Sequence, residues 1–174
     1  LLIEDLRAGD FAFNPKDESL WGMRHSDGYS SLIRLEPPYN DYNSVHVFDF
    51  GYDLYDLDIS PDGSFLSGAY VDAWGQQFLV RYEIDALIGG QVQPDTLWSS
   101  DISSPANFVF SPDGRYLYGS TFYTGVSNIF RFDTELDTME VISNSETGFF
   151  RPVSVSDDSV AVMMYTGDGF QPVL

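Results

Sequence analysis

A four-residue motif recurs along the chain at intervals of about 45 to 50 residues. Its copies are Asn14-Pro15-Lys16-Asp17, Ser60-Pro61-Asp62-Gly63, Ser111-Pro112-Asp113-Gly114 and Ser156-Asp157-Asp158-Ser159. A period of this length is typical of a supersecondary unit that is stacked several times, because each unit buries its apolar face against the next. The repeat therefore predicts an array of similar units.

The intact copies of the motif carry the residues of a tight turn. Proline presets φ at the second position, aspartate accepts a local backbone hydrogen bond, and glycine supplies a positive φ. We therefore assign a structural role to Pro61–Gly63 and Pro112–Gly114. The first copy lacks the glycine and the fourth lacks the proline, so the turn type is expected to differ in those two units.

Short apolar stretches flank each turn at matching positions and indicate four strands per unit, as in the blades of a β-propeller. The strand before the turn alternates apolar and other residues, as in Leu57-Asp58-Ile59. The fourth unit ends within its third strand. The expected blades are 9–50, 53–100, 104–145 and 149–174.

The chain is therefore predicted to be all-β: about three and a half four-stranded antiparallel blades in a single partial β-propeller domain, residues 1–174. A closed propeller contains about four to eight blades. We expect an incomplete propeller here, with further blades or domains of the same polypeptide as its partners.

An arginine recurs in the third strand of the first three units, and an acid follows it two residues later on the same strand face. This spacing favours ion pairing between blades over contact with a ligand. The residues that share a face are Arg34 with Glu36, Arg81 with Glu83 and Arg131 with Asp133.

The longest interval between motif copies is the middle one. Its additional residues lie between Arg81 and Ser111, where 84–90 has the pattern of one helical turn that glycine ends. We expect this insertion to belong to a loop and not to the core.

At the turns Ser60–Gly63 and Ser111–Gly114, and across nearly the whole chain, the repeats resemble those of the TolB-like (WD40-like, Ser-Pro-Asp-Gly repeat) β-propeller family. The resemblance implies the fold but no single function, because similar repeats build partner-binding propellers, the gating propellers of serine oligopeptidases, and sensor or surface modules. It also implies a periplasmic or secreted bacterial protein.

Charge and composition exclude several classes of protein. Eight Lys and Arg against 27 Asp and Glu give a net charge of -19, which repels the phosphates of nucleic acid. A solvated acidic surface is the favoured explanation of this charge, with capture of cations or basic partners as the alternative. The chain has no cysteine, so it forms no disulfide. It also has no apolar run of about 18 residues, so no membrane span is expected in it.

No catalytic motif is found in the sequence. Gly-x-Ser-x-Gly is absent, and His25 and His46 fall at different positions of the first unit, so no Ser-His-Asp triad is expected. Signatures of zinc, P-loop and dinucleotide sites are absent too, and no cofactor or metal is expected. The acids at 53, 56 and 58 could bind calcium, but their spacing is not that of an EF-hand, and the wet wall of a propeller channel is the favoured interpretation.

Superposing the repeats places polar residues where each innermost strand begins, and we expect them to ring one channel mouth. They are Asp10, Asp56 and Asn107, with Arg151 one position earlier in the fourth unit. The loops between second and third strands should emerge on the same face with His25, Tyr29, Trp74, Tyr123 and Tyr165. Polar groups among aromatic side chains suit a recognition surface. The alternative is that these loop residues pack against the next blade.

The sequence thus predicts a non-catalytic protein-interaction or ligand-binding module of a larger protein. Its expected partner is a protein or a small polar or cationic ligand, bound at the channel mouth. One alternative is a regulatory propeller that gates a serine peptidase whose catalytic domain lies outside this chain. Another is a structural sensor or surface module.

Overall fold

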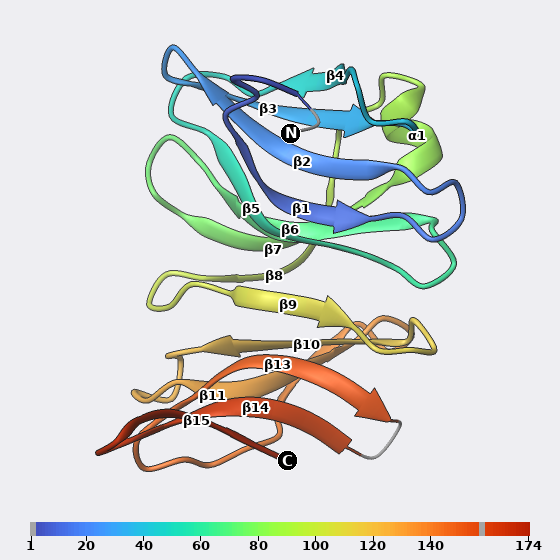
Figure 1. The fold of residues 1–174 in the computed structure, drawn as a ribbon. Coiled ribbons are helices and arrows are strands. Elements are labelled where there is room, and N and C mark those ends of the chain that lie inside the picture. Colours follow the sequence, from blue (N-terminus) through green and yellow to red (C-terminus); the bar gives the residue numbers. More distant parts are fainter. Residues whose placement is uncertain (1–2, 157–158) are drawn as a thin grey trace.

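The computed structural model describes residues 3–156 and 159–174, which form four antiparallel sheets stacked as successive blades (Figure 1). The first sheet contains β1 (Ala8–Phe13), β2 (Leu20–Ser26), β3 (Tyr29–Leu35) and β4 (Asn43–Val47), and the second contains β5 (Asp53–Ile59), β6 (Phe65–Val71), β7 (Gln77–Glu83) and β8 (Asp95–Ser100). The third contains β9 (Ala106–Phe110), β10 (Tyr116–Thr121), β11 (Asn128–Asp133) and β12 (Thr138–Val141), and the fourth contains β13 (Phe149–Ser156), β14 (Ser159–Thr166) and β15 (Gly169–Val173). The predicted all-β, incomplete propeller is confirmed.

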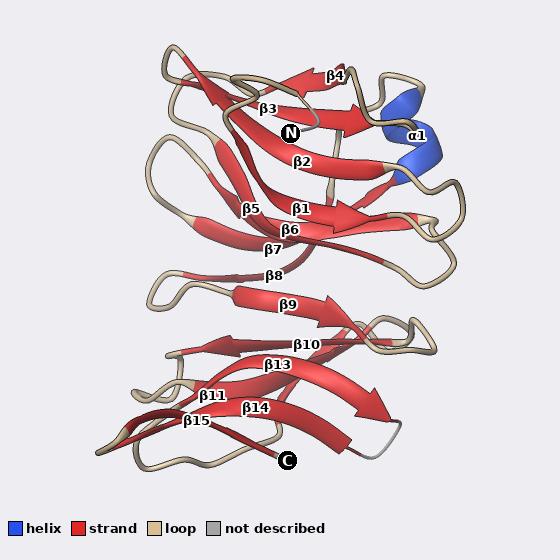
Figure 2. Cartoon of the chain, in the orientation of Figure 1, coloured by secondary structure: helices blue, strands red, loops and turns tan. Residues whose placement is uncertain are grey.

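Each sheet is a meander in which strands adjacent in sequence are hydrogen-bonded neighbours. The first strands of the four sheets, β1, β5, β9 and β13, contact one another in series. Strands dominate the cartoon in Figure 2, and the one helix of the described residues is α1 (Ile84–Ile88). No helix in that part of the chain has the length and apolar character needed to cross a membrane. The innermost strands therefore lie side by side. The stack of four sheets forms an arc, and these strands run along its inner edge.

The Ser-Pro-Asp-Gly turns form as their residue types require. The Ser60 hydroxyl donates to Asp62 Oδ1 at 2.6 Å and accepts the backbone N–H of Phe65 at 2.9 Å. Gly63 takes a φ of +71° and donates its backbone N–H to the Ser60 carbonyl at 2.8 Å. The turn at Ser111 repeats this arrangement. In the fourth copy, Asp157 and Asp158 lie outside the described residues.

The first turn departs from this pattern, as expected from its missing glycine. Its positive φ, +59°, falls at Glu18. The Asn14 side chain bonds the second turn instead, donating from Nδ2 to the Gly63 carbonyl at 3.2 Å. Successive turns therefore lie side by side on one end of the blades, at the right in Figure 1.

Apolar side chains between adjacent sheets form the core. Between the first and second sheets, Trp21 and Met23 of β2 belong to one buried cluster with Leu54 of β5 and Leu66 of β6. The next interface gathers residues of the second and third sheets, namely Leu79, Phe108, Leu117, Phe130 and Phe132. The sheets are therefore stacked as propeller blades are, each covering the face of its neighbour.

The helical insertion differs from its prediction in one respect. A helical turn does form in α1 and Gly89 follows it, as expected. However, Ile84 and Leu87 are only 2% and 1% exposed and belong to the core cluster between the first two sheets. The prediction that the insertion lies outside the core was wrong, because residues three apart share one helix face.

The arginine pairing between blades was also predicted wrongly, since each ion pair lies within one blade. Arg81 pairs with Asp95 at 3.1 Å and Arg131 with Glu140 at 2.6 Å, and in each case the acid lies directly opposite on the outer strand. The reason is geometric, because directly opposed residues of antiparallel strands have the closest side chains. Arg34 contacts Glu36, with which it shares a strand face, at 2.9 Å and Asp17 at 2.8 Å, and both acids belong to the first blade.

A half-buried carboxylate joins the second and third blades. Asp58 Oδ2 accepts the backbone N–H of Phe110 at 2.6 Å. Burial raises the pKa of Asp58, although hydrogen bonds from the backbone of Phe110 and Ile59 oppose the shift. The backbone N–H of Phe110, at the inner edge of β9, thus obtains a hydrogen-bond acceptor that its own sheet does not supply.

We expect Gly119→Ala to destabilise the chain, because a Cβ at this position would overlap the ring of Phe108. The free energy of unfolding should fall by about 1 to 3 kcal/mol, as for other overpacked cores. Gly9→Ala is the matched control, because no atom lies within 4 Å of the position of its Cβ. Urea unfolding of both variants measures the difference, and equal stabilities would contradict the packing described at Gly119.

The free energy of unfolding of Asp58→Asn, relative to that of the wild type, should increase as pH rises. The raised pKa means that the folded wild type holds the Asp58 proton more tightly than the unfolded chain does. Wild-type stability is therefore lost as pH rises from the usual 3.8 through the folded pKa, whereas the amide does not titrate.

Asp62→Asn is the control with the opposite sign, because hydrogen bonds from Ser60 and Ser64 lower the pKa of Asp62. The Asp62 carboxylate stabilises the wild type above pH 3.8, and this contribution is lost as pH falls through the lowered folded pKa. Unfolding curves between pH 3 and pH 7 compare the two variants with the wild type. For each variant, the free energy of unfolding is compared with that of the wild type. Differences that change in the same direction with pH in both variants would contradict the assignment.

Candidate functional site

Four polar residues share one unusual backbone conformation at the inner edge of the arc. Asp10, Asp56, Asn107 and Arg151 have φ values of 50°, 53°, 51° and 49°. Each lies where the register between the first and second strands of its sheet shifts, as at a β-bulge. We call these four the ring positions.

The fourth ring position corrects the alignment of the repeats. Counting back from the motif placed Arg151 one residue before its counterparts. In the structure it is equivalent to them, because Val153 pairs with Ala161 in the way that Asp58 pairs with Ser67. A second register shift, between Ser154 and Ser156, accommodates the additional residue.

Two ring positions are joined directly across a blade boundary. Asn107 donates its backbone N–H to Asp56 Oδ2 and its side-chain N–H to Asp56 Oδ1, both at 2.8 Å. Asp58, two residues further on, is bonded to the same strand. These two acids therefore serve the boundary between blades. The described residues contain no group of three or more His or acidic side chains arranged to hold a metal ion.

The acidic half of the ring lies at the boundary between the first two blades. The pKa of Asp10 is raised by burial first, and then by the nearby carboxylates of Asp56 and Asp53, while His25 opposes the shift. His25 lies near the end of β2 and not in a loop as predicted, and its Nε2 lies 3.1 Å from Asp53 Oδ2, so a residue of the first blade reaches the second. Three carboxylates thus concentrate negative charge at this point, and a cation bound there would relieve their repulsion.

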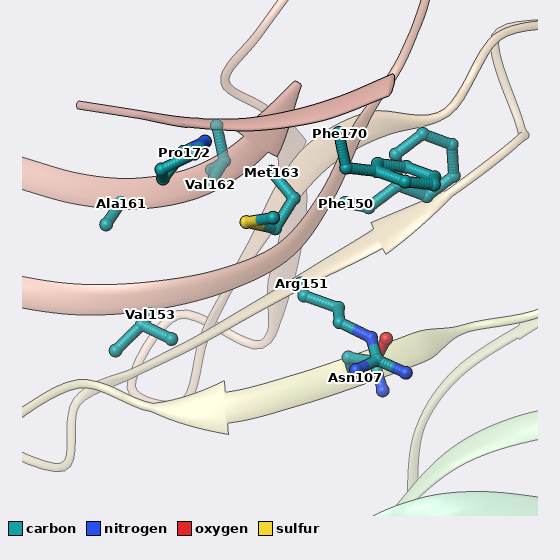
Figure 3. Close-up of a pocket in the computed structure, with 9 residues that line it drawn as sticks. All are labelled: Asn107, Phe150, Arg151, Val153, Ala161, Val162, Met163, Phe170 and Pro172. Carbon is teal, nitrogen blue, oxygen red and sulfur yellow. The ribbon is translucent and has the colours of Figure 1, made fainter. Parts of the chain in front are cut away.

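The other half of the ring is neutral to basic and adjoins a cavity. Asn107 and Arg151 line a space of about 600 Å³, together with apolar residues of the last sheet (Figure 3). Those residues include Phe150 and Phe170, whose rings pack edge to face at 5.4 Å. Along the arc, the ring positions therefore change from two acids through an amide to a cation.

Three of the five loop residues predicted to surround the mouth have aromatic packing partners. Tyr29 contacts Phe50, Tyr123 contacts Trp98 and Phe130, and Tyr165 contacts Phe170, with ring centroids 5.3 to 6.4 Å apart. The contact of Tyr123 with Trp98 reaches the preceding blade, whereas Tyr165 and Phe170 belong to the same sheet. Packing of these residues against the next blade therefore stays a prediction. Trp74 is 82% exposed, and His25 bonds to Asp53.

Asp53 and Phe150 were missing from the predicted mouth. Asp53 had been considered only as a calcium ligand, and Phe150 carries no recognisable signal. The partnership of His25 and Asp53 connects different blades, so no spacing within one repeat could reveal it.

No protein-family model and no curated protein matches the chain. Solved structures do. TolB from Acinetobacter baumannii superposes with a TM-score of 0.73 at 15% identity, over 95% of this chain and 40% of that one. A protein from Agrobacterium tumefaciens described as TolB gives 0.75 at 20% identity, over 94% and 57%.

A puromycin-hydrolysing peptidase of Mycobacterium tuberculosis is also similar, with a TM-score of 0.66 at 13% identity over 90% of this chain and 28% of that one. The chain thus spans less than two thirds of each of these proteins. Identities this low carry information on the fold alone. By its repeats and its superposition, the chain has the TolB-like β-propeller fold.

Proposed function

We propose that the chain is a non-catalytic β-propeller module that binds a cationic group of a protein partner or of a small polar ligand at the acidic half of its ring. The observation that carries the proposal is the gathering of three carboxylates, those of Asp10, Asp53 and Asp56, at one blade boundary, where desolvation and the other two carboxylates raise the pKa of Asp10. An ammonium or guanidinium group between these acids would be favoured electrostatically.

The local hydrogen bonding favours binding over hydrolysis at this point. His25 contacts the carboxylate of Asp53, and within the described residues no serine hydroxyl is bonded to its ring. A Ser-His-Asp arrangement requires a hydroxyl on the second ring nitrogen. Binding of a cationic group, in contrast, needs only the negative charge of the acidic half of the ring and access to the inner edge of the blades.

A gating propeller of a serine peptidase is the second candidate, and the likeness to the Mycobacterium tuberculosis peptidase favours it. In that case the same ring would lie on the path of the substrate. A structural sensor or surface module is the third candidate, and the family resemblance supports a periplasmic or secreted location for all three. Peptide hydrolysis by the full-length polypeptide, with cleavage altered by ring substitutions, would favour gating.

The test removes two carboxylates from the acidic half of the ring. The Asp10→Asn, Asp53→Asn variant retains both side-chain shapes, and asparagine tolerates the positive φ at position 10. We expect its affinity for tetralysine at about 0.15 M ionic strength, where the Debye length is about 8 Å, to fall at least about tenfold, which corresponds to about 1.4 kcal/mol. Isothermal titration calorimetry measures the change.

The matched control removes two exposed acids from the opposite end of the blades. Glu83→Gln with Asp85→Asn makes the same change in charge beside α1, at the right in Figure 1. Its affinity should fall less than about twofold, because exposed charges more than a Debye length away are screened. Equal losses in both variants would contradict a defined site and indicate general attraction to an acidic surface.

A further inference from the structure

A second cavity, distinct from the ring, lies between the outer parts of the first and second blades. It has a volume of about 240 Å³. We call it the rim groove, and its principal lining residues are His46, Phe48, Tyr70, Phe78, Tyr82 and Pro94. They come from the end of the first blade, from two strands of the second blade, and from the segment after α1.

Aromatic rings form half of this lining, in five of its ten residues. The centroid of Tyr70 lies 6.1 Å from that of Phe48 and 6.1 Å from that of Phe78, with the ring planes tilted by 47° and 43°. Phe48 is only 5% exposed, whereas Tyr70 and Phe78 are half-buried. Tyr70 and Phe78 therefore carry the ring surfaces that a compact cation could contact.

The charges around the groove also suit a cation. The pKa of Tyr70 is raised by burial first, then by Tyr52, Asp72 and Asp49, so two carboxylates lie near its hydroxyl. Burial lowers the pKa of His46, although Asp49 opposes the shift, and the imidazole is therefore neutral at pH 7. Neither lysine nor arginine lines the groove.

A further phenol of the second blade lines the groove. Tyr82 is 3% exposed and belongs to the core cluster between the first two sheets. Its pKa is raised by burial and by the nearby Tyr70. Its ring adds a largely buried aromatic surface to the lining.

One wall of the groove belongs to this blade alone. Val92, Gln93 and Pro94 follow α1, and they connect the third and fourth strands of the second sheet by the longest such link in the structure. Ile84 and Leu87 anchor that link in the core. The groove is therefore a specific feature of one blade boundary and not a by-product of the repeat.

We propose that the rim groove binds a methylated ammonium group of the trimethylammonium type. Such a group is apolar at its surface and positively charged, so it gains both from aromatic contact and from the nearby carboxylates. A hard metal cation would need clustered oxygen ligands, and an anion would be repelled by the net charge of -19. The proposal does not depend on the function proposed for the ring, because the two sites share no residue.

Choline, its uncharged isostere 3,3-dimethylbutan-1-ol and a trimethyl-lysine peptide are the probes, titrated into the chain and followed by calorimetry. We expect choline to bind at least about tenfold more tightly than the isostere, because cation–π attraction requires the charge. Equal binding of choline and isostere, or binding of neither cation, would overturn the proposal. The tighter of the two cations identifies the source of the group, a free compound or a modified side chain.

Substitutions then locate the binding. Phe78→Leu and Tyr70→Leu should each weaken choline binding at least about fivefold, whereas Tyr70→Phe, which retains the ring, should largely preserve it. Phe122→Leu removes an exposed aromatic ring in the third blade and should have no effect. Near-UV circular dichroism checks the fold of each variant. Choline binding that is unchanged in both Leu variants would overturn the proposal, and unchanged binding in Asp10→Asn separates this site from the ring.

Discussion

Contact between successive innermost strands is the constraint on which the other features of the structure depend. A strand at the inner edge of a blade has backbone groups that its own sheet does not pair. At the boundary between the second and third blades, Asp56 and Asp58 satisfy the N–H groups of Asn107 and Phe110. Left-handed residues at the bulge present those groups, which explains why aspartate and asparagine, the residues that tolerate this conformation, fill three of the four ring positions.

The same constraint sets the electrostatics of the inner edge. Every blade contributes one residue at an equivalent point, so the four ring side chains share one backbone setting. Asp56 bonds to Asn107, but two ionised acids do not bond to each other, and the pKa of Asp10 is raised by burial and then by repulsion from Asp56 and Asp53. The candidate binding site is thus the boundary at which the two ring positions are both acids. The rim groove lies at the same pair of blades, where the segment after α1 adds a wall at the outer edge.

Sequence reasoning succeeded for features that repeat and failed for contacts between different elements. The turns at Ser60 and Ser111 and three of the four ring positions recur in register, so superposing the repeats aligned them, whereas Arg151 was aligned one residue too early. The burial of Ile84 and Leu87, the pairing of Arg81 with Asp95, and the contact of His25 with Asp53 each depend on how two elements are placed relative to one another. No periodicity within one repeat contains that information.

The most direct test of this account is a double-mutant cycle between Asp56 and Asn107, measured by urea unfolding at pH 7. Asp56→Ala removes both bonds to Asn107, whereas Asn107→Ala removes only the side-chain bond, so the coupling reports the bond from Asn107 Nδ2 to Asp56 Oδ1. The strain of alanine at a positive φ cancels in the cycle. The account predicts a coupling free energy of about 1.5 to 3 kcal/mol. Effects that add to within about 0.5 kcal/mol would show that the two side chains act independently, and would contradict the claim that the inner strands are joined through the ring.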